Sequence, residues 1–269
     1  MKKILSIHSS VMIGFVGNSV VLPVLTKLGH QPIAINTVSL PAHPGYGIAA
    51  GGPTPAEQVE DFLSALSQLD QLPAINHIVT GYMGTTGQID VIAKTIQEWC
   101  MAQPKGIYVF DPVLGDNDRL YIDPGVAAAM QSKLLPLATI VTPNQFELGY
   151  LTGTTINSQG SAIRASNDLL EQYSELQTVI VTGVEDDSEL ADLMISRDDA
   201  PLMGPALADG KNVSGGGDLL TALFIGYLAS GHKQADAFFR ASKQAQKVLA
   251  ASSTSRELAL YENLNALPD

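Results

Sequence analysis

The feature of this sequence that most limits its fold is an alternation of short apolar runs with longer helical periods. The runs are rich in β-branched residues and continuously apolar. Runs of this kind are typical of strands buried on both faces of a parallel sheet. We expect strands at residues 3–8, 32–38, 76–81, 107–112, 139–143, 178–183 and 190–196.

Between these runs the apolar residues recur at helical spacing. We expect helices near residues 18–28, 55–69, 86–103, 124–135, 144–152, 160–174, 217–229 and 233–251. This order of elements predicts an α/β fold with a doubly wound, mostly parallel sheet and helices on both faces. A chain of 269 residues can form one large domain or two small ones. No internal repeat or low-complexity segment divides it, and we expect one domain over residues 1–269.

In such sheets ligands bind beyond the carboxyl ends of the strands. Polar, acidic and glycine-rich groups follow the expected strands at Ser9, Ser10, 43–47, 81–85, 111–116, 142–147, 182–183 and 214–218. The stretch 39–54 is so rich in Gly and Pro that we expect no regular element there. It is a candidate lid or substrate loop, and we expect it to be more mobile than its flanking strands.

The stretch "VSGGGDLLTA" (213–222) places three glycines directly before a carboxylate and a helical segment. The first N–H groups of a helix have no partner within it, and an anion can reach them where side chains are missing. Gly215, Gly216 and Gly217 could therefore form an anion hole, with Asp218 beside it as a proton acceptor. The alternative is a glycine turn with an aspartate N-cap. Ser214 could have capped the helix without any glycines, which favours the functional interpretation.

Two acidic motifs follow neighbouring strands, "DPVLGD" (111–116) and "TPNQFE" (142–147). Asn144 and Glu147 are three residues apart and share one helix face near its N-terminus. Carboxylate and amide oxygens at a strand end suit Mg²⁺, bound directly or through water. The structural alternative is a capping box that pairs Glu147 with Thr142 or Asn144.

Composition excludes several kinds of partner. The net charge of −12 repels nucleic acid and anionic lipid, so neither is expected as a partner. A bound nucleotide triphosphate would need local hydrogen-bond donors or a metal. Cys100 is the single cysteine, which fits a reducing cytoplasm. The N-terminal apolar run is broken at 8–10 and is a first strand rather than a signal peptide, and no apolar stretch is long enough to span a membrane.

Other motifs do not fit. Residues 204–212 resemble a Walker A loop but have five residues between the glycines instead of four, and Asn212 stands where Ser or Thr is required. Residues 14–19 do not form a dinucleotide-binding fingerprint, and a hydrolase elbow of the GxSxG type is missing. The five histidines show no metal-ligand spacing, and His43, within the 39–54 loop, is the one that we select as a site candidate.

Taken together, the motifs resemble those of the pyridoxal kinases of the ribokinase-like superfamily. The resemblance covers nearly the whole chain, from "HSSVMIGFVGNS" through "NTVSLPAHPGYG", "TGYMGT", "FDPVLGD", "VTPNQFELGYLTG" and "IVTG" to "VSGGGDLLTALF". It implies ATP-dependent phosphorylation of the 5′-hydroxyl of pyridoxal, pyridoxine or pyridoxamine in vitamin B6 salvage. It also implies Mg²⁺, often together with K⁺, and a homodimer.

The resemblance also implies a role for each matching residue. Asp218 matches the catalytic base and Gly215–Gly217 the anion hole. The nucleotide-phosphate and magnesium positions are matched by Asp111, Asp116, Thr142, Asn144 and Glu147, of which Asp111 and Glu147 are the candidate metal ligands, and the ATP contacts include Thr182 and Gly183. The vitamin contacts are matched by Ser9, His43, Gly45, Tyr46, Tyr82 and Asp218.

The sequence departs from the family in two places. Pro44 stands where members commonly carry a polar contact to the vitamin ring, and the glycine run lacks the Ser, Thr or Val often found at its second position. Three other functions therefore stay open: a hydroxymethylpyrimidine kinase, a small-sugar kinase, and a binding protein without catalysis. Asp218 argues against a mere binder, and Tyr46 and Tyr82 favour an aromatic substrate over a sugar.

Overall fold

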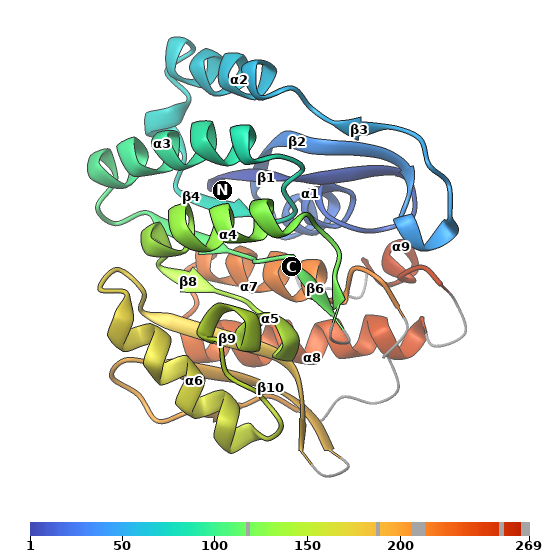
Figure 1. Ribbon diagram of the computed structural model, residues 1–269, viewed down its shortest axis with the longest axis vertical. Coiled ribbons are helices and arrows are strands. Elements are labelled where there is room, and N and C mark those ends of the chain that lie inside the picture. Colours follow the sequence, from blue (N-terminus) through green and yellow to red (C-terminus); the bar gives the residue numbers. More distant parts are fainter. Residues whose placement is uncertain (117–118, 187–188, 206–212, 253–255, 265–269) are drawn as a thin grey trace.

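The computed structural model describes residues 1–116, 119–186, 189–205, 213–252 and 256–264 (Figure 1). Within these residues the chain forms a sheet of nine strands in the order β11-β10-β9-β8-β5-β4-β1-β2-β3. Most of the Walker-like stretch that we rejected, 206–212, lies outside the described residues.

Six strands form the parallel body of the sheet. They are β1 (Lys3–Ile13), β2 (Gln31–Ala42), β4 (His77–Thr80), β5 (Ile107–Phe110), β8 (Ile140–Val141) and β9 (Thr178–Asp186). The antiparallel strands at the edges are β3 (Gly52–Pro53), β10 (Glu189–Ser196) and β11 (Leu202–Met203). A separate small hairpin pairs β6 (Gly115–Asp116) with β7 (Arg119–Leu120).

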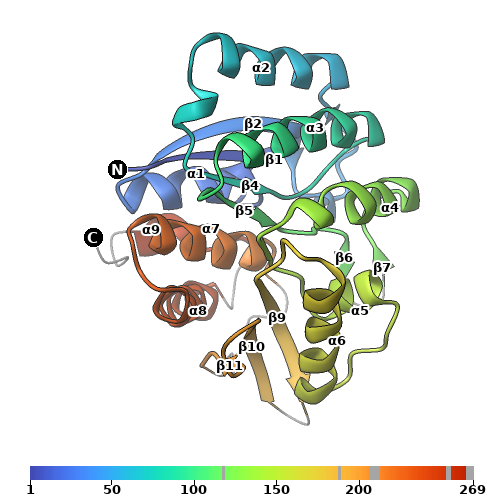
Figure 2. The same ribbon diagram turned by 90° about the vertical axis from the view of Figure 1, so that its left-hand side faces the viewer.

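Helices cover both faces of the sheet (Figure 2). One face carries α2 (Ala56–Gln68), α3 (Thr86–Ala102), α4 (Pro124–Lys133), α5 (Gln145–Thr152) and α6 (Gln159–Gln172). The other carries α1 (Asn18–Lys27), α7 (Gly216–Ala229), α8 (Gln234–Ala251) and α9 (Leu260–Leu264). Short 3-10 turns lie at Pro44–Tyr46, Leu72–Ala74 and Leu135–Leu137.

The parallel strands are apolar on both sides because each side packs against a helical layer. Tyr108 and Phe110 of β5 belong to the core under α2–α6, whereas Val109 between them belongs to the core under α1, α7 and α8. Successive strand residues point to opposite faces, so both sets must be apolar. The doubly wound, mostly parallel α/β fold expected from the sequence is confirmed, and each expected helix begins and ends within two residues of its predicted limits.

Three strands continue past the residues where we expected them to end: β1, β9 and, as described below, β2. β1 runs on to Ile13, so Ser9 and Ser10 lie within the strand instead of after it, and β9 runs on to Asp186 through Thr182 and Gly183. In each case a neighbouring strand extends alongside, β2 beside β1 and β10 beside β9. Strand pairing is made by the backbone, so polar side chains do not end it.

Two further expectations were wrong. The 39–54 stretch contains regular structure, because β2 continues to Ala42 and β3 returns antiparallel beside it, with Val38 opposite Pro53. The last expected strand, β10, joins the sheet antiparallel to β9 rather than parallel, since only two residues separate the two strands in the sequence. The part of 39–54 between β2 and β3 holds the Pro44–Tyr46 turn.

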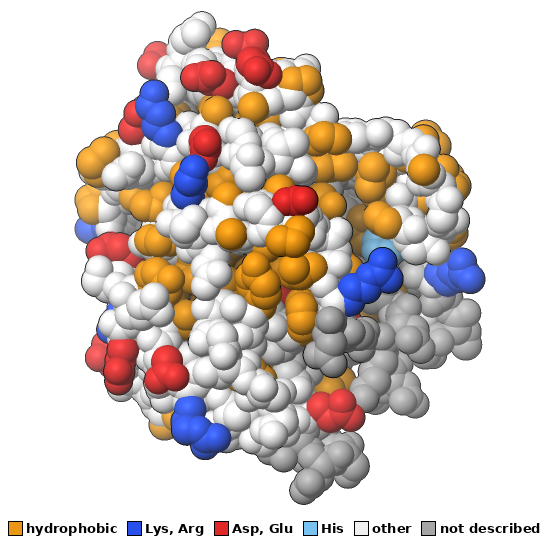
Figure 3. All heavy atoms as spheres, in the orientation of Figure 1, with side chains coloured by type: hydrophobic (Ala, Val, Ile, Leu, Met, Phe, Trp, Pro, Cys, Tyr) orange, Lys and Arg blue, Asp and Glu red, His pale blue; other side chains and the backbone are white. Residues whose placement is uncertain are grey.

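The surface fits the charge pattern of the sequence. On the face shown in Figure 3, the Lys and Arg side chains of the described residues are isolated from one another and form no continuous basic patch. Among the described residues, the model contains no helix whose length and apolarity would allow it to cross a bilayer.

His77, at the start of β4, gives the fold a testable pH dependence. Burial, together with the positive charges of Lys2 and His30, lowers the pKa of His77 to about 4. A histidine whose pKa is lower in the folded state contributes full stability above about pH 6.5 and loses it as the pH falls toward 4.

We expect His77→Gln, which cannot titrate in this range, to lose less stability than the wild type between pH 7 and pH 5. Urea unfolding at both pH values measures this difference. Equal losses in the two proteins would show that His77 is solvated in the folded state.

Candidate active site

Asp218 lies in the first turn of α7 and is 9% exposed. Its Oδ2 accepts a hydrogen bond of 2.7 Å from the backbone N–H of Gly17, in the loop between β1 and α1. Its Oδ1 lies 2.9 Å from Nε2 of His8, although the ring N–H is not aligned for a regular hydrogen bond. Burial opposes ionisation of Asp218, but His8 and Gly17 outweigh it, so the pKa of Asp218 is lowered. The group is therefore a carboxylate near neutral pH.

The three glycines before Asp218 differ in what requires them. Gly215 has φ +91° and touches the backbone carbonyl of Phe15, so a side chain there would be strained and would overlap the β1–α1 loop. A Cβ on Gly216 would lie 3.2 Å from Leu249, whereas a Cβ on Gly217 would meet no protein atom within 4 Å. Gly217 is exposed, and α7 has no side-chain cap among the described residues. The helix N-terminus is thus open to an anion at Gly217, while Gly215 serves the backbone.

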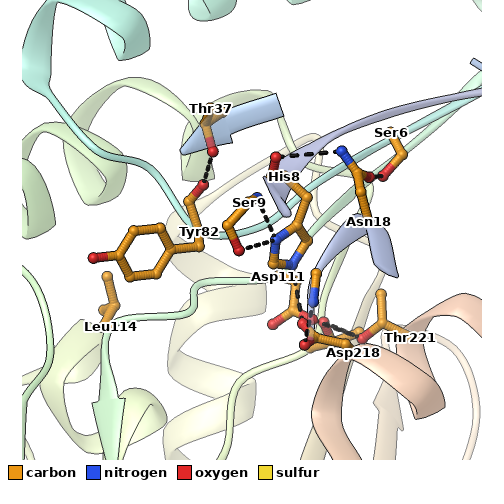
Figure 4. A network of polar contacts seen from close by, with 12 residues as sticks. Ser6, His8, Ser9, Asn18, Thr37, Tyr82, Asp111, Leu114, Asp218 and Thr221 are labelled. Carbon is orange, nitrogen blue, oxygen red and sulfur yellow. Dashed lines mark hydrogen bonds and ion pairs between the residues drawn. The ribbon is translucent and has the colours of Figure 1, made fainter. Parts of the chain in front are cut away.

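Asp111, directly after β5, belongs to the same cluster of polar contacts (Figure 4). The hydroxyl of Thr221 lies 3.0 Å from Asp111 Oδ2 and 3.0 Å from the hydroxyl of Thr142, which links these two predicted residues through α7. The pKa of Asp111 is raised well above its usual value by burial and by the negative charges of Asp218 and Glu147. A cation beside Asp111 would relieve this repulsion.

Glu147 and Asn144 form the capping box that was the structural alternative. Asn144 Oδ1 accepts from the N–H of Glu147 at 2.9 Å, and Glu147 Oε2 accepts from the N–H of Asn144 at 2.8 Å. Glu147 Oε1 accepts from the N–H of Leu114 at 2.9 Å. Burial raises the pKa of Glu147 to about 8, against the opposing effect of these N–H groups. Its carboxyl therefore anchors the 111–116 loop onto α5.

The remaining nucleotide candidates surround this loop. Asn144 pairs with Thr182 in a parallel bridge, and its Nδ2 donates to the carbonyl of Gly115 at 2.8 Å. Gly183 has φ +63°, and its N–H donates to Asp192. Asp116 is exposed in the β6–β7 hairpin. Thr182, Asn144 and the hairpin thus lie on connected elements, toward the carboxyl ends of β8 and β9.

The vitamin candidates fall into two groups. Ser9 is buried beside His8, and Tyr82 is half-buried after β4, with its carbonyl accepting from Thr37; Figure 4 shows the Tyr82 ring beside Leu114. The other group is His43, Gly45 and Tyr46 in the substrate loop, where His43 Nδ1 accepts from Gly45 N–H at 3.1 Å. The charge of His43 also lowers the pKa of Asp218.

Tyr46 is 38% exposed and is joined to Glu257 near the C-terminal end of the described residues. Its hydroxyl donates to Glu257 Oε1 at 2.5 Å, and Glu257 Oε2 accepts from the N–H of Phe15 at 3.1 Å. This hydrogen bond raises the pKa of Tyr46. Among the described residues, no hydrogen bond or ring contact joins Tyr46 to Tyr82.

Sequence reasoning missed His8 and Glu257 as residues of this site. His8 directly precedes Ser9, which was selected, but it was set aside because histidines without metal spacing carry little signal. Glu257 lies in a segment without any motif. Thr221 could have been found, since it is three residues after Asp218 and shares its helix face.

Of the two candidate metal ligands, Asp111 fits Mg²⁺ better than Glu147 does. The described residues contain no group of three His, Cys, Asp or Glu side chains arranged to hold a metal. Asp111 fits a metal because the negative charges of Asp218 and Glu147 surround it, and a cation would offset them. Glu147 fits less well as a direct ligand, because both of its oxygens accept backbone N–H bonds.

A ribokinase-like sheet whose rim combines a carboxylate with an open helix N-terminus defines the class of small-molecule kinases. The chain belongs to the phosphomethylpyrimidine kinase family, whose model matches residues 29–259. It is 33% identical over 271 residues to the pyridoxal kinase PdxY of Corynebacterium diphtheriae, covering 98% of this chain and 95% of that protein. It is also 33% identical to the pyridoxine/pyridoxal/pyridoxamine kinase of Bordetella bronchiseptica, covering 98% and 93%.

Solved structures show the same similarity. The pyridoxal kinase of Leishmania donovani in complex with ADP and pyridoxamine superimposes with a TM-score of 0.91 at 29% identity, covering 99% of this chain and 96% of that one. The pyridoxal kinase of Entamoeba histolytica gives a TM-score of 0.92 at 26% identity, covering 99% and 95%. The resemblance inferred from the motifs is therefore confirmed at the level of family and fold.

The capping box at Glu147 predicts a stability effect that needs no ligand. Above the Glu147 pKa of about 8, where the carboxylate accepts on both oxygens, Glu147→Gln would place an amide N–H₂ against a backbone N–H. At pH 9 we therefore expect a loss of about 1–3 kcal/mol in the free energy of unfolding. Urea unfolding without nucleotide or Mg²⁺ measures it, with Glu98→Gln on the exposed side of α3 as control. Unchanged stability together with weakened Mg²⁺ binding would instead make Glu147 a metal ligand.

Proposed function

We propose that this protein transfers the γ-phosphoryl group of ATP to the 5′-hydroxyl of pyridoxal, and also of pyridoxine and pyridoxamine, as a single kinase domain over residues 1–269. The observation that carries the proposal is the pairing of a buried, ionised Asp218 with the open helix N-terminus at Gly217. The family membership and the vitamers bound by the similar Leishmania donovani kinase support it.

Asp218 acts as the general base. An alcohol has a far higher pKa than a carboxylate, so Asp218 cannot produce a free alkoxide and accepts the proton late, as the phosphoryl group transfers. His8 and Gly17 occupy one site on each carboxylate oxygen. A carboxylate has about four acceptor sites, so room remains for the substrate hydroxyl.

The start of α7 holds the transferring phosphoryl group. The N–H groups at Gly216 and Gly217 point out of the helix end, and the helix dipole adds partial positive charge there. Because these donors are fixed by the fold, they stabilise the charge of the transition state without rearranging. In a chain of net charge −12, this local site offsets the repulsion of a triphosphate.

Asp111 would hold Mg²⁺, directly or through water, with Glu147 fixing the loop that carries it. When bound, Mg²⁺ neutralises charge on the ATP phosphates. The proposed nucleotide contacts are Asp111, Asp116, Thr142, Asn144, Glu147, Thr182 and Gly183, and the proposed vitamin contacts are Ser9, His43, Gly45, Tyr46 and Tyr82. K⁺, a homodimer and a cytoplasmic location complete the proposal on the strength of the family resemblance.

The function is tested by measuring ATP consumption with pyridoxal, pyridoxine, pyridoxamine, hydroxymethylpyrimidine and ribose in parallel. We expect the B6 vitamers to be preferred, with and without added K⁺. Faster turnover of hydroxymethylpyrimidine would favour the sister activity that the name of the family suggests. If none of the five compounds supports ATP consumption, the remaining hypothesis is a binding protein that does not catalyse a reaction.

We expect Asp218→Asn to lower kcat by ~10²–10⁴, the usual contribution of a general base. The KM for ATP should change little, because the nucleotide contacts lie elsewhere. Steady-state kinetics check this, with Asp90→Asn on the exposed surface of α3 as control. Normal turnover by the Asp218 variant would remove it from the chemistry.

Gly217→Ala tests the anion position. The new methyl meets no protein atom and replaces a helical glycine, so we expect unfolding stability to stay the same or to rise by about 0.5–1 kcal/mol. The methyl would occupy the phosphoryl position, so kcat/KM for ATP should fall at least tenfold. Gly160→Ala, at the same position of α6, is the matched control. Full activity of Gly217→Ala would place the phosphoryl group elsewhere.

A further inference from the structure

His8 is the partner of Asp218 that neither the motifs nor the family resemblance assigns. It lies in β1 and is 2% exposed. The register of β1 against β2 shifts directly after it, between the pairs His8–Asn36 and Ser10–Ser39. Such irregularities re-aim side chains next to active sites. Here the ring of His8 is turned toward Asp218, at the opposite end of the chain (Figure 4).

The ring of His8 is fixed on several sides. The backbone N–H of Ser9 donates to Nδ1 at 2.8 Å, so Nδ1 is an acceptor and the proton of the neutral ring lies on Nε2. In the protonated ring Nε2 carries a proton as well. A Cβ on Gly17 would lie 2.7 Å from Nδ1, and a Cβ on Gly81 would overlap the ring. The ring thus has one orientation, in which Nε2 lies 2.9 Å from Asp218 Oδ1.

We propose that His8 is a positioning residue, whose Nε2 proton holds the carboxylate of Asp218 in the orientation that leaves its free acceptor sites to the substrate hydroxyl. This inference rests on the proposed role of Asp218 as base. The backbone N–H of Gly17 contacts Oδ2 and Nε2 of His8 contacts Oδ1, so both carboxylate oxygens of Asp218 are held. Catalytic hydrogen bonds are often poorly aligned without substrate, so we expect the Nε2 proton of His8 to align with Oδ1 when substrate binds.

The charged groups near this pair set the pH dependence. Asp218 and Asp111 face His8, and His8 and His43 act on Asp218. Burial lowers the pKa of His8, but attraction to Asp218 outweighs this and raises it. The lowered pKa of Asp218 keeps the base ionised until the pH falls well into the acidic range. Without His8, ionisation would be lost at a higher pH, so the acidic limb of the pH–kcat profile should move to higher pH.

Two amide substitutions distinguish a role in positioning Asp218 from a role in merely filling the space of the His8 ring. The amide nitrogen of Gln reaches the place of histidine Nε2, whereas that of Asn reaches only the place of Nδ1. We expect His8→Gln to retain kcat within about threefold and to keep the acidic limb of the wild type. We expect His8→Asn to lose about 10- to 100-fold in kcat, with the acidic limb moved to higher pH and the KM for ATP unchanged.

The proposal is overturned if folded His8→Asn matches the wild type in kcat and in its pH profile, or if His8→Gln is as impaired as His8→Asn. Melting temperatures of both variants are measured alongside, since a purely structural role would make activity follow stability.

A second readout does not depend on activity. In ¹⁵N-histidine-labelled wild type, the His8 signal, assigned by its loss in His8→Gln, should show a proton on Nε2. A proton on Nδ1 alone would overturn the proposal, even if His8→Asn failed to fold. The wild type could be inactive on B6 vitamers and still carry the proton on Nε2, with the His8 signal shifted in Asp218→Asn. That result would contradict the proposed function but would support the pairing of His8 with Asp218.

Discussion

The site depends on the contact between the start of α7 and the loop that follows β1. Gly215 lies against the carbonyl of Phe15, and the N–H of Gly17 donates to Asp218, joining residues 201 positions apart. This close approach requires glycine at position 215, whereas Gly17 is required by its own backbone conformation and by its contacts with His8 and Ser9. The contact determines where the carboxylate lies relative to the helix N-terminus. The proposed base and the proposed anion hole are consequently one rigid unit, packed on a sheet that is apolar on both faces. Rigid placement of this kind is what phosphoryl transfer demands, because most of its rate comes from positioning and charge stabilisation.

The acidic groups of this rim have distinct electrostatic environments although they lie close together. Asp218 has hydrogen-bond donors and a lowered pKa, whereas Asp111 is buried among like charges and has a raised pKa. Carboxyl groups whose environments separate their pKa values have separate tasks. Asp218 is suited to remain ionised and accept a proton, and Asp111 is suited to a cation. Glu147 instead accepts backbone N–H bonds from Leu114, in the loop after Asp111, and from Asn144 at the start of α5.

The fold could be predicted from the sequence in most respects, because strand and helix periods are local patterns. The strand ends could not, since the extension of β1 and β9 depends on a neighbouring strand that no local pattern reveals. The same distinction holds within the site. Asp218 and the glycine run form a motif within four residues, and both were found. His8 and Glu257 act on residues far away in the chain, and a lone histidine in an apolar strand gives no sign of its partner. The glycine run itself was interpreted too uniformly, because Gly215 is required by its backbone conformation and by the Phe15 carbonyl, Gly216 lies close to Leu249, and Gly217 is open.

Glu257 gives the substrate loop a connection that the motifs do not contain. Its carboxylate holds Tyr46 of that loop with one oxygen and Phe15 of the β1–α1 loop with the other. Phe15 in turn contacts Gly215 through its carbonyl and Tyr261 through its ring. The proposed vitamin side of the site and the proposed phosphate side are therefore joined through one segment near the C-terminal end of the described residues. Pro44 lies in the same turn as Tyr46, so the position where the family resemblance implies a polar contact to the vitamin belongs to a turn that Glu257 holds through Tyr46. The Glu257 carboxylate thus helps to fix the position of this turn.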